Sequence, residues 1–278
     1  MDWLHVVILG VIEGLTEFLP ISSTAHLTIA ERLFGIPLLD PGITAFTAVI
    51  QLGSILAAVV YFRFDIARIV IAWSRGLVRP ELRDYPEYHM GWNVVIGSVP
   101  IAILGLGLHS VIEGPFRNLW VVVIGLIGWS LVMWLADRRG KGNRGETSMT
   151  WLDAVVIGLV QCFALIPGVS RSGATISAGL LRGMDRVSAT RISFLLGIPA
   201  LLAAGGWEAV TQAGHISATV GWLPALVGIV VAFVVGYLSI AWLLSFVSRN
   251  TFTAFIVYRV GLGLLLAGLI VAGVVPPS

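Results

Sequence analysis

Six apolar segments, each close to the length needed to cross a lipid bilayer, dominate the sequence. A transmembrane helix needs about 20 predominantly apolar residues. The segments that meet or approach this length are residues 43–62, 93–109, 119–136, 192–206, 223–247 and 252–274. Only 12% of the residues are charged, against about 25% in a typical soluble domain. The sequence therefore predicts an all-α polytopic membrane protein with a single membrane domain over residues 1–278.

The overall charge and the cysteine content exclude two classes of function. A net charge of +2 is too small to indicate a nucleic-acid partner. The single cysteine, Cys162, excludes a disulfide framework and a cysteine-based metal site, and its apolar neighbours predict a packing role. The expected partners are therefore the membrane itself and a ligand bound within it.

Two further apolar pieces, residues 4–18 and 151–166, are too short to cross a bilayer. Each ends at a proline, Pro20 or Pro167, because a proline disfavours helical geometry in the residue before it. After each break the chain resumes with serine and threonine, which are good N-caps for a second short helix. This pattern predicts two re-entrant hairpins, whose non-helical backbone must be covered by protein or water.

The basic residues predict how the chain is oriented. Thirteen of the 17 lysines and arginines fall in residues 63–92, 137–149 and 182–191 or at Arg249. The positive-inside rule places these residues on the inner side and both termini outside. Six crossings plus two hairpins satisfy this arrangement. Residues 66–73, which are flanked by arginines, are expected to lie along the inner interface.

The two hairpins resemble each other at an offset of 148 residues. The matching pairs are Gly10 with Gly158, Glu13 with Gln161, Ser22 with Ser170, and Thr24 with Ser172. This similarity predicts an internal repeat of residues 1–136 and 150–278. Because three spans, an odd number, follow each hairpin, the second copy is inverted. Inverted repeats with broken helices place their binding site near the midplane, where the two breaks meet.

The first polar tract carries two carboxylates, Glu13 and Glu17. They are four residues apart, so on a helix they share one face. A carboxylate deep in a bilayer is rare without a function, and its hard oxygen atoms suit magnesium or calcium. The pair predicts a divalent-cation site or an acid/base pair, and the alternative is snorkelling or capping near the outer interface.

Hydroxyl groups and a histidine follow these carboxylates. Ser22, Ser23 and Thr24 are either N-caps alone or hydroxyls of a binding site. His26 lies three residues after Ser23, so one helical turn is expected to bring its imidazole near Ser23 or Ser22. Because histidine is the most frequent general acid or base, this tract predicts proton transfer.

The second polar tract is built around Arg171, which lies between Ser170 and Ser172. A guanidinium keeps its charge and fits phosphate oxygens as a bidentate fork. Gly173 allows backbone amides to approach a ligand, and a helix N-terminus there adds positive potential. The alternative is a structural ion pair between Arg171 and a glutamate of the first hairpin.

Three polar residues inside the spans are further candidates. Arg259 is either a second phosphate clamp or a side chain that snorkels toward the inner interface. Gln51 and Ser54 share a helix face and are expected to add polar contacts. Arginines, hydroxyls and carboxylates that face one another in a membrane suit a polyanion with a bound metal. This is the set of groups that phosphoryl transfer needs.

Both polar tracts resemble those of the undecaprenyl-diphosphate phosphatases, the bacitracin-resistance family. The first matching tract, EGLTEFLPISSTAH, covers residues 13–26, and the second, PGVSRSGAT, covers residues 167–175. The chain length, the two hairpins and the Tyr258–Arg259 pair also match. The sequence departs from the family at Ala25, where glycine is usual, and this small-for-small change is expected to matter little.

The resemblance implies a bacterial plasma-membrane enzyme with its active site toward the outside. It would use a divalent cation to hydrolyse a C55 polyprenyl diphosphate to the monophosphate and inorganic phosphate. This reaction recycles the lipid carrier of cell-wall synthesis and confers bacitracin resistance. The catalytic residues carried over by position are Glu13, Glu17, Ser23, His26 and Arg171. The supporting residues are Ser22, Thr24, Ser170, Ser172, Thr175 and Arg259.

Two mechanisms and one other function are compatible with these residues. Either Ser23 attacks the terminal phosphorus and His26 takes its proton, or Ser23 only positions the substrate while His26 or a metal-activated water attacks. A lipid or anion transporter is the alternative function, because inverted repeats also build carriers. A type-2 phosphatidic-acid phosphatase is disfavoured, because Ser177 stands where that family has histidine.

The oligomeric state is left open by the sequence. Glycines within the spans allow helices to approach closely, either within one chain or between copies in a homo-oligomer. These glycines are Gly125, Gly128, Gly261 and Gly263.

Overall fold

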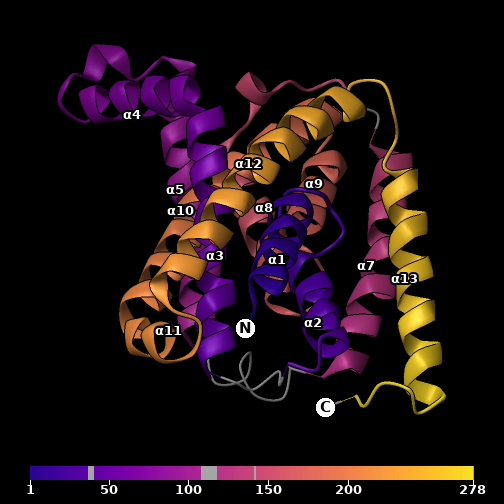
Figure 1. The fold of residues 1–278 in the computed structure, drawn as a ribbon. Coiled ribbons are helices and arrows are strands. Elements are labelled where there is room, and N and C mark those ends of the chain that lie inside the picture. Colours follow the sequence, from indigo (N-terminus) through magenta and orange to yellow (C-terminus); the bar gives the residue numbers. More distant parts are fainter. Residues whose placement is uncertain (37–40, 108–117, 141, 278) are drawn as a thin grey trace.

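The computed structural model describes residues 1–36, 41–107, 118–140 and 142–277. Helices form almost all of the regular structure in these ranges (Figure 1). The α-helices are α1 (Trp3–Thr16), α2 (Ser23–Leu33), α3 (Pro41–Tyr61), α4 (Arg63–Val78), α5 (Pro86–Gly107), α7 (Leu119–Arg139), α8 (Trp151–Gln161), α9 (Arg171–Leu181), α10 (Arg186–Thr211), α11 (Ala213–Thr219), α12 (Trp222–Val247) and α13 (Thr253–Val271). The short 3-10 helices are η1 (Pro80–Leu82), η2 (Glu146–Ser148) and η3 (Cys162–Leu165).

Within the described ranges, five helices are long and apolar enough to cross a membrane, and the chain is an all-α polytopic membrane protein. These helices are α3, α7, α10, α12 and α13. The segment predicted at 93–109 forms the later part of α5, and its last two residues lie outside the described ranges. The short span predicted at 192–206 is wrong in length, because α10 begins at Arg186, is capped by Asp185 and continues through Pro199.

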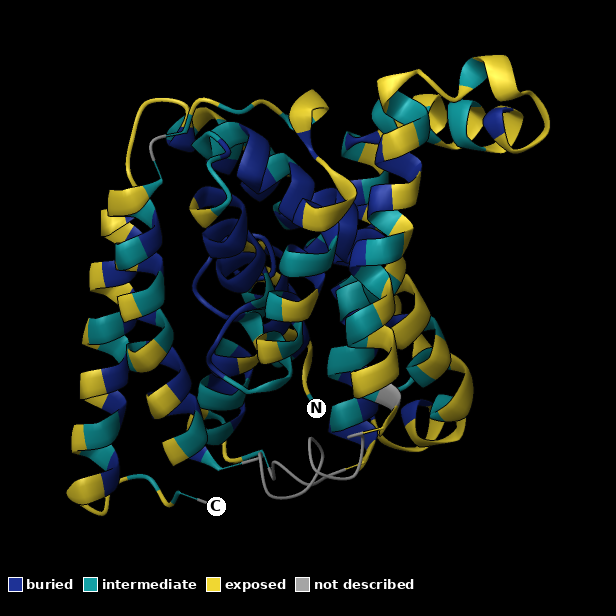
Figure 2. Ribbon diagram, turned by 180° about the vertical axis from the view of Figure 1, so that it is seen from behind, coloured by how far each residue is buried: buried dark blue, intermediate teal, exposed yellow. Residues whose placement is uncertain are grey.

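The outward faces of the spans are apolar, as lipid contact requires. On α12, Val230, Val234, Leu238 and Trp242 follow one another every fourth residue, and each is about half exposed or more. Figure 2 shows the same mixture of exposed and half-buried residues along the outer helices, around a buried interior. An exposed apolar surface of this extent marks contact with a membrane rather than with water.

Both predicted hairpins are present as two helices separated by a break. In the first hairpin, α1 ends at Thr16 and α2 begins at Ser23. In the second, α8 is followed directly by η3, which ends at Leu165, and α9 begins at Arg171. The residue before each second helix has an unusual positive φ, 77° at Ser22 and 76° at Ser170. Both hydroxyls cap their helix by accepting a hydrogen bond from the amide three residues later.

The first helix of each hairpin approaches a neighbouring helix through an equivalent glycine. A Cβ atom added to Gly10 of α1 would lie 2.9 Å from the carbonyl oxygen of Gly228 in α12. A Cβ atom added to Gly158 of α8 would lie 2.5 Å from the carbonyl oxygen of Gly97 in α5. The hairpins therefore share both their cap and their mode of packing. The inverted relation of the two repeats stays a prediction.

The polar ends of the bundle differ from each other. Figure 1 shows α4 projecting from one end, whereas the C-terminus lies at the opposite end. The predicted interfacial stretch 66–73 lies within α4, where Phe64, Ile71 and Val78 are exposed together. An exposed apolar face on a helix rich in arginine fits a position at the membrane surface.

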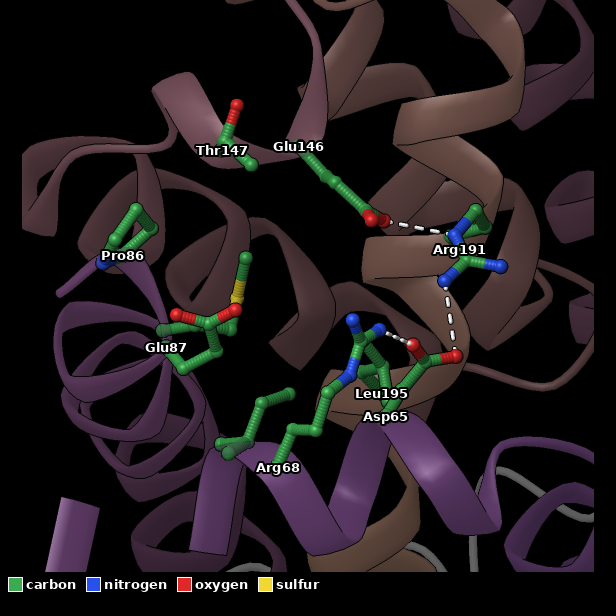
Figure 3. Close-up of a pocket in the computed structure, with 10 residues that line it drawn as sticks. Asp65, Arg68, Pro86, Glu87, Glu146, Thr147, Arg191 and Leu195 are labelled. Carbon is green, nitrogen blue, oxygen red and sulfur yellow. Dashed lines mark hydrogen bonds and ion pairs between the residues drawn. The ribbon is translucent and has the colours of Figure 1, made fainter. Parts of the chain in front are cut away.

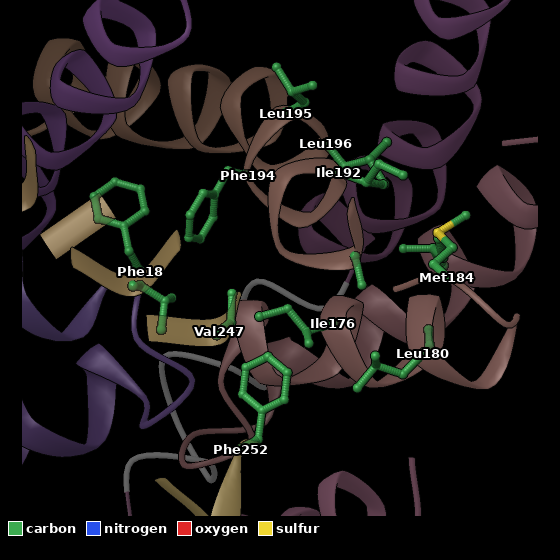
Figure 4. Close-up of a cluster of buried hydrophobic side chains, with 14 of the residues drawn as sticks. Phe18, Ile176, Leu180, Met184, Ile192, Phe194, Leu195, Leu196, Val247 and Phe252 are labelled. Carbon is green, nitrogen blue, oxygen red and sulfur yellow. The ribbon is translucent and has the colours of Figure 1, made fainter. Parts of the chain in front are cut away.

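Aromatic packing fixes the first break against α10. Phe18, in the break, and Phe194, in α10, are both 1% exposed. Their ring centroids are 5.2 Å apart in an edge-to-face arrangement, and Figure 4 shows them within the largest buried cluster. This geometry is favourable for aromatic pairs. It sets the position of Glu17, the neighbour of Phe18, relative to α10.

Two of the four glycines singled out in the sequence, Gly125 of α7 and Gly263 of α13, pack within this chain. A Cβ atom added to Gly125 would meet the backbone of residues 167–168, and one added to Gly263 would meet Ile127. Gly128 and Gly261 have no such neighbour within 4 Å in the described part of the chain.

Candidate active site

An ion pair joins the two polar tracts. Nη2 of Arg171, at the start of α9, donates to Oε1 of Glu17 in the first break at 3.0 Å. The two side chains are only 10% and 5% exposed. Nη1 of Arg171 donates to the carbonyl oxygen of Ser193 in α10 at 2.9 Å. The pairing that the sequence raised as a structural alternative is thus present, and it lies at the meeting point of the hairpins.

The second oxygen of Glu17 holds the hydroxyl of Ser23. Ser23 Oγ donates to Oε2 at 2.7 Å, and Gln51 Nε2 approaches the same oxygen at 3.5 Å. Glu17 therefore links Arg171 of the second hairpin to Ser23, the first residue of α2 in the first hairpin. The hydroxyl of Ser23 therefore donates its hydrogen bond to Glu17 and not to His26.

His26 is directed elsewhere, into a contact with Tyr258 of α13. Its Nδ1 lies 2.8 Å from the carbonyl oxygen of Ser22, and its Nε2 lies 2.7 Å from the Tyr258 hydroxyl. A carbonyl oxygen can only accept, so Nδ1 carries a hydrogen, and in the neutral imidazole Nε2 accepts from the tyrosine hydroxyl. The two rings are nearly parallel, with an angle of 7° and centroids 5.6 Å apart.

Tyr258 is a site residue that the sequence did not assign. Its only signal was its position beside Arg259 in a pattern shared with the resembling family. Tyrosine is common at membrane interfaces, so the residue type alone gives no prediction of a contact with His26.

Several buried polar atoms near the ion pair have no hydrogen-bond partner among the described residues. They are Oε1 of Glu13, Oγ of Ser54 and Nε of Arg171. Glu13 is 1% exposed and interacts electrostatically with both Glu17 and Arg171. An unpaired buried polar atom is costly, and a site that receives a ligand is a frequent reason for one.

The carboxylates fit a divalent cation that has other ligands as well. The described part of the chain holds no cluster of three or more acidic, histidine or cysteine side chains. Magnesium, however, is often bound by one or two carboxylates, with water and substrate phosphates as its other ligands. The unpaired Oε1 of Glu13, four residues before Glu17, meets that requirement.

The hydroxyls of the second tract are used mainly to hold the hairpins together. Ser172 Oγ donates to the carbonyl oxygen of Leu19 in the first break at 3.1 Å and lies 3.1 Å from Ser170 Oγ. Thr175 Oγ1 lies 2.6 Å from Ser193 Oγ. The Gly173 amide donates to the cap hydroxyl of Ser170 and is therefore not free for a ligand. In the first tract, Thr24 is exposed.

Arg259 is fully buried, so the snorkelling alternative is wrong. Its Nη1 donates to the carbonyl oxygen of Pro20 at 3.2 Å, and its Nη2 donates to that of Gly168 at 2.8 Å. Nε donates to Ser130 Oγ at 3.1 Å. One side chain from α13 thereby satisfies backbone carbonyls of both breaks, which is the cover that non-helical backbone needs within a membrane.

A small pocket lies away from this site, between α4, α5, η2 and α10. Figure 3 shows Arg191 in it, between Asp65 at 3.0 Å and Glu146 at 2.7 Å. None of the site residues predicted from the sequence lines this pocket. Its ion pairs attach α4 and η2 to the start of α10, and so belong to the scaffold.

Fold and site together define an integral membrane protein that presents an arginine, carboxylates and hydroxyls at two opposed helix breaks, an arrangement suited to a phosphate-bearing lipid. The family described as Bacitracin resistance protein BacA matches residues 6–265. The chain belongs to this family.

Its relatives have similar length. The chain is 54% identical to a protein of Cutibacterium acnes named Undecaprenyl-diphosphatase, with 99% of each chain covered. It is 51% identical to Undecaprenyl-diphosphatase 3 of Frankia casuarinae, again over 99% of each chain. Undecaprenyl-diphosphatase 1 of Streptomyces avermitilis is 50% identical over 97% of each chain.

Proposed function

We propose that this chain hydrolyses undecaprenyl diphosphate to undecaprenyl phosphate and inorganic phosphate, and so recycles the lipid carrier of cell-wall synthesis. The observation that carries the proposal is the contact of Arg171 and Ser23 with the two oxygens of one carboxylate, Glu17. The names of the relatives and the bacitracin-resistance family support the same substrate and activity.

Arg171 binds the diphosphate in this proposal. Its Nε is buried and has no partner among the described residues, which leaves a donor for a phosphate oxygen. Its charge neutralises the phosphoryl oxygens as the bond to the leaving group breaks. Glu17 keeps the guanidinium in place while it also holds the Ser23 hydroxyl, so both groups act on one phosphoryl group.

Glu13 and Glu17 would hold a magnesium or calcium ion. When bound, the ion adds positive charge near the phosphate oxygens and lowers their repulsion toward a nucleophile. The unpaired Oε1 of Glu13 supports this assignment.

Two routes for the attack remain in the proposal. In the first, Ser23 Oγ attacks the terminal phosphorus and its proton passes to Glu17, to which the hydroxyl already donates at 2.7 Å. The P–O bond to undecaprenyl phosphate breaks as this lipid leaves, and water then hydrolyses the phosphoserine to inorganic phosphate. In the second, Ser23 and Glu17 orient a water molecule that attacks directly. His26 lies beside this site, with Nδ1 bonded to the Ser22 carbonyl oxygen and Nε2 to the Tyr258 hydroxyl, and Nε2 is the imidazole nitrogen that can take up a proton.

The location proposed for this reaction is the outer side of the bacterial plasma membrane. The distribution of basic residues supports this orientation, because it places α4 and its arginines inside and the termini outside. The first hairpin would then open toward the outer side. Labelling of single cysteines introduced near the termini and in α4 of intact cells tests this orientation.

Phosphate release from undecaprenyl diphosphate by purified protein in detergent tests the activity. Release that stops with a chelator and with Arg171→Ala supports the proposal. No release by the wild-type protein with magnesium or calcium contradicts it. Acid quenching with labelled substrate separates the two routes, because only serine attack leaves a phosphorylated Ser23.

A transporter remains the alternative function, since a carrier also needs an anion site between inverted repeats. The hydrogen bond between Ser23 and Glu17 favours the enzyme, because it holds a nucleophile beside a proton acceptor, as serine attack requires. The detergent assay decides here as well, since no gradient exists in detergent and a carrier releases no phosphate.

A further inference from the structure

One turn of α10, from Ser193 to Gly197, lies against the guanidinium of Arg171. The carbonyl oxygen of Ser193 accepts a hydrogen bond from Nη1 at 2.9 Å. Gly197 has no side chain at the place where the guanidinium lies. A Cβ atom added there would be 2.5 Å from Cζ and 3.0 Å from Nη2 of Arg171. Any larger residue at position 197 therefore competes with Arg171 for the same space.

We propose that Gly197 is a positioning residue for Arg171: its missing side chain allows the Ser193–Gly197 turn to cradle the guanidinium, which then points Nη2 at Glu17. This inference rests on the proposed function for its effect on catalysis, but its geometry stands independently. With the cradle intact, Nη1 and Nη2 are bonded to protein and Nε is left for a ligand.

The surroundings determine which group moves when the cradle is filled. α10 cannot withdraw easily, because Phe194 beside the cradle is 1% exposed and packs edge-to-face on Phe18 of the first break. The guanidinium, by contrast, is the end of a long side chain with several rotatable bonds. A methyl group at position 197 therefore displaces Arg171 and breaks its contact with Glu17, whereas the backbone stays in place.

Gly197→Ala tests this inference, with Gly206→Ala as the matched control on the same helix. An added Cβ at Gly206 has no neighbour within 4 Å among the described residues, so that variant measures the general effect of alanine in α10. We expect Gly197→Ala to lower the rate of phosphate release about 100-fold, as misplacing a group by about 1 Å can do. Gly206→Ala should keep wild-type activity. Equal activity of the two variants would overturn the inference.

A double-mutant comparison shows whether the effect acts through Arg171. Gly197→Ala should lower the melting temperature of the wild-type protein, because it breaks the bonds of Arg171 to Glu17 and Ser193. It should leave the melting temperature of Arg171→Ala unchanged, because the space is then empty. An equal fall in both backgrounds means that Gly197 serves only helix packing, and the inference is wrong.

Folding and function can be separated in the same experiment. If Gly197→Ala does not accumulate as folded protein, recovery of folded protein with the added Arg171→Ala change supports the inference, and lack of recovery overturns it. If Arg171→Ala itself retains full activity, the proposed role of Arg171 in catalysis fails, whereas absence of release by the wild-type protein contradicts the proposed function. Thermal coupling between positions 171 and 197 in that case still supports the cradle.

Discussion

The two hairpins share a backbone and differ in chemistry. Ser22 and Ser170 have nearly the same positive φ and cap their helices in the same way. Around these caps the first hairpin carries Glu13 and Glu17, whereas the second carries Gln161 and Arg171. Acids from one copy and a permanent cation from the other meet at one point. The comparison shows that two hairpins with the same cap geometry carry different side chains, so that one main-chain design serves a site with acids on one side and a cation on the other.

The largest expected effect comes from removing the cation of the second hairpin. Arg171→Ala should lower kcat/KM for undecaprenyl diphosphate about 10³-fold, the lower end of what an arginine contributes to phosphoryl transfer. Phosphate release in detergent measures it. Arg75→Ala, at an arginine on exposed α4, serves as the control and should be silent. A loss below tenfold for Arg171→Ala would show that the Arg171–Glu17 ion pair contributes little to catalysis.

The next effect concerns the residue that binds both hairpins at once. Arg259→Met leaves the carbonyl oxygens of Pro20 and Gly168 without their buried donor, at a cost of about 3 kcal/mol in the free energy of unfolding. The melting temperature in detergent should fall by about 6 °C or more. Arg249→Met, at an exposed arginine, should change it little. An unchanged melting temperature for Arg259→Met would show that the breaks hold their shape unaided.

Exchange of equivalent residues tests how far the hairpins have diverged. Glu13→Gln should lower kcat/KM about 100-fold by removing a charge from the site. It should also raise the cation concentration needed for half-maximal rate. Gln161→Glu, at the equivalent buried position, should not restore activity, because Gln161 Nε2 donates to the Gly97 carbonyl oxygen and a carboxylate cannot replace that donor. An active double variant would mean that the two copies are interchangeable.

The outline of the site was predictable from sequence because it depends on rare residue types. Proline breaks short apolar helices, and hydroxyl residues restart them. Glutamate and arginine within apolar tracts have few partners other than each other. These rules predict both hairpins and the meeting of Glu17 with Arg171, which the structure shows.

The rest was not predictable, for reasons that lie in three dimensions. Helical spacing placed His26 near Ser23 or Ser22, and the imidazole does contact the Ser22 carbonyl oxygen, but spacing did not reveal that Glu17 accepts the hydrogen bond of the Ser23 hydroxyl. Gly197 and Tyr258 are ordinary residues of apolar helices, and only the packing of α10 and α13 gives them a role. The same holds for Arg259: its position within an apolar span is visible in the sequence, but its hydrogen bonds to the Pro20 and Gly168 carbonyl oxygens are not.

A smaller effect tests the contact between the first hairpin and α13. Tyr258→Phe removes the hydrogen bond to Nε2 of His26 and keeps the stacked ring. One such bond corresponds to about a tenfold loss of kcat/KM. Tyr237→Phe is a matched control, since the ring of Tyr237 packs on Tyr61 within the bundle. Equal activity of both variants would show that catalysis does not depend on the hydrogen bond between Tyr258 and His26.

The smallest effect concerns what the hairpins share. Ser22→Gly and Ser170→Gly each lose a cap hydroxyl, which costs a few tenths of a kcal/mol when glycine replaces it. Glycine relieves the positive φ at both positions but adds freedom to the unfolded chain. These terms nearly cancel, so the melting temperature should stay within about 2 °C of the wild type for both variants. Ser22→Ala and Ser170→Ala keep the unfavourable φ and should each cost about 1 kcal/mol.

If Ser22→Gly also keeps its activity, that serine is a cap alone. If it loses activity while Ser170→Gly does not, the Ser22 hydroxyl contacts the substrate, and the hairpins differ at their shared cap as well.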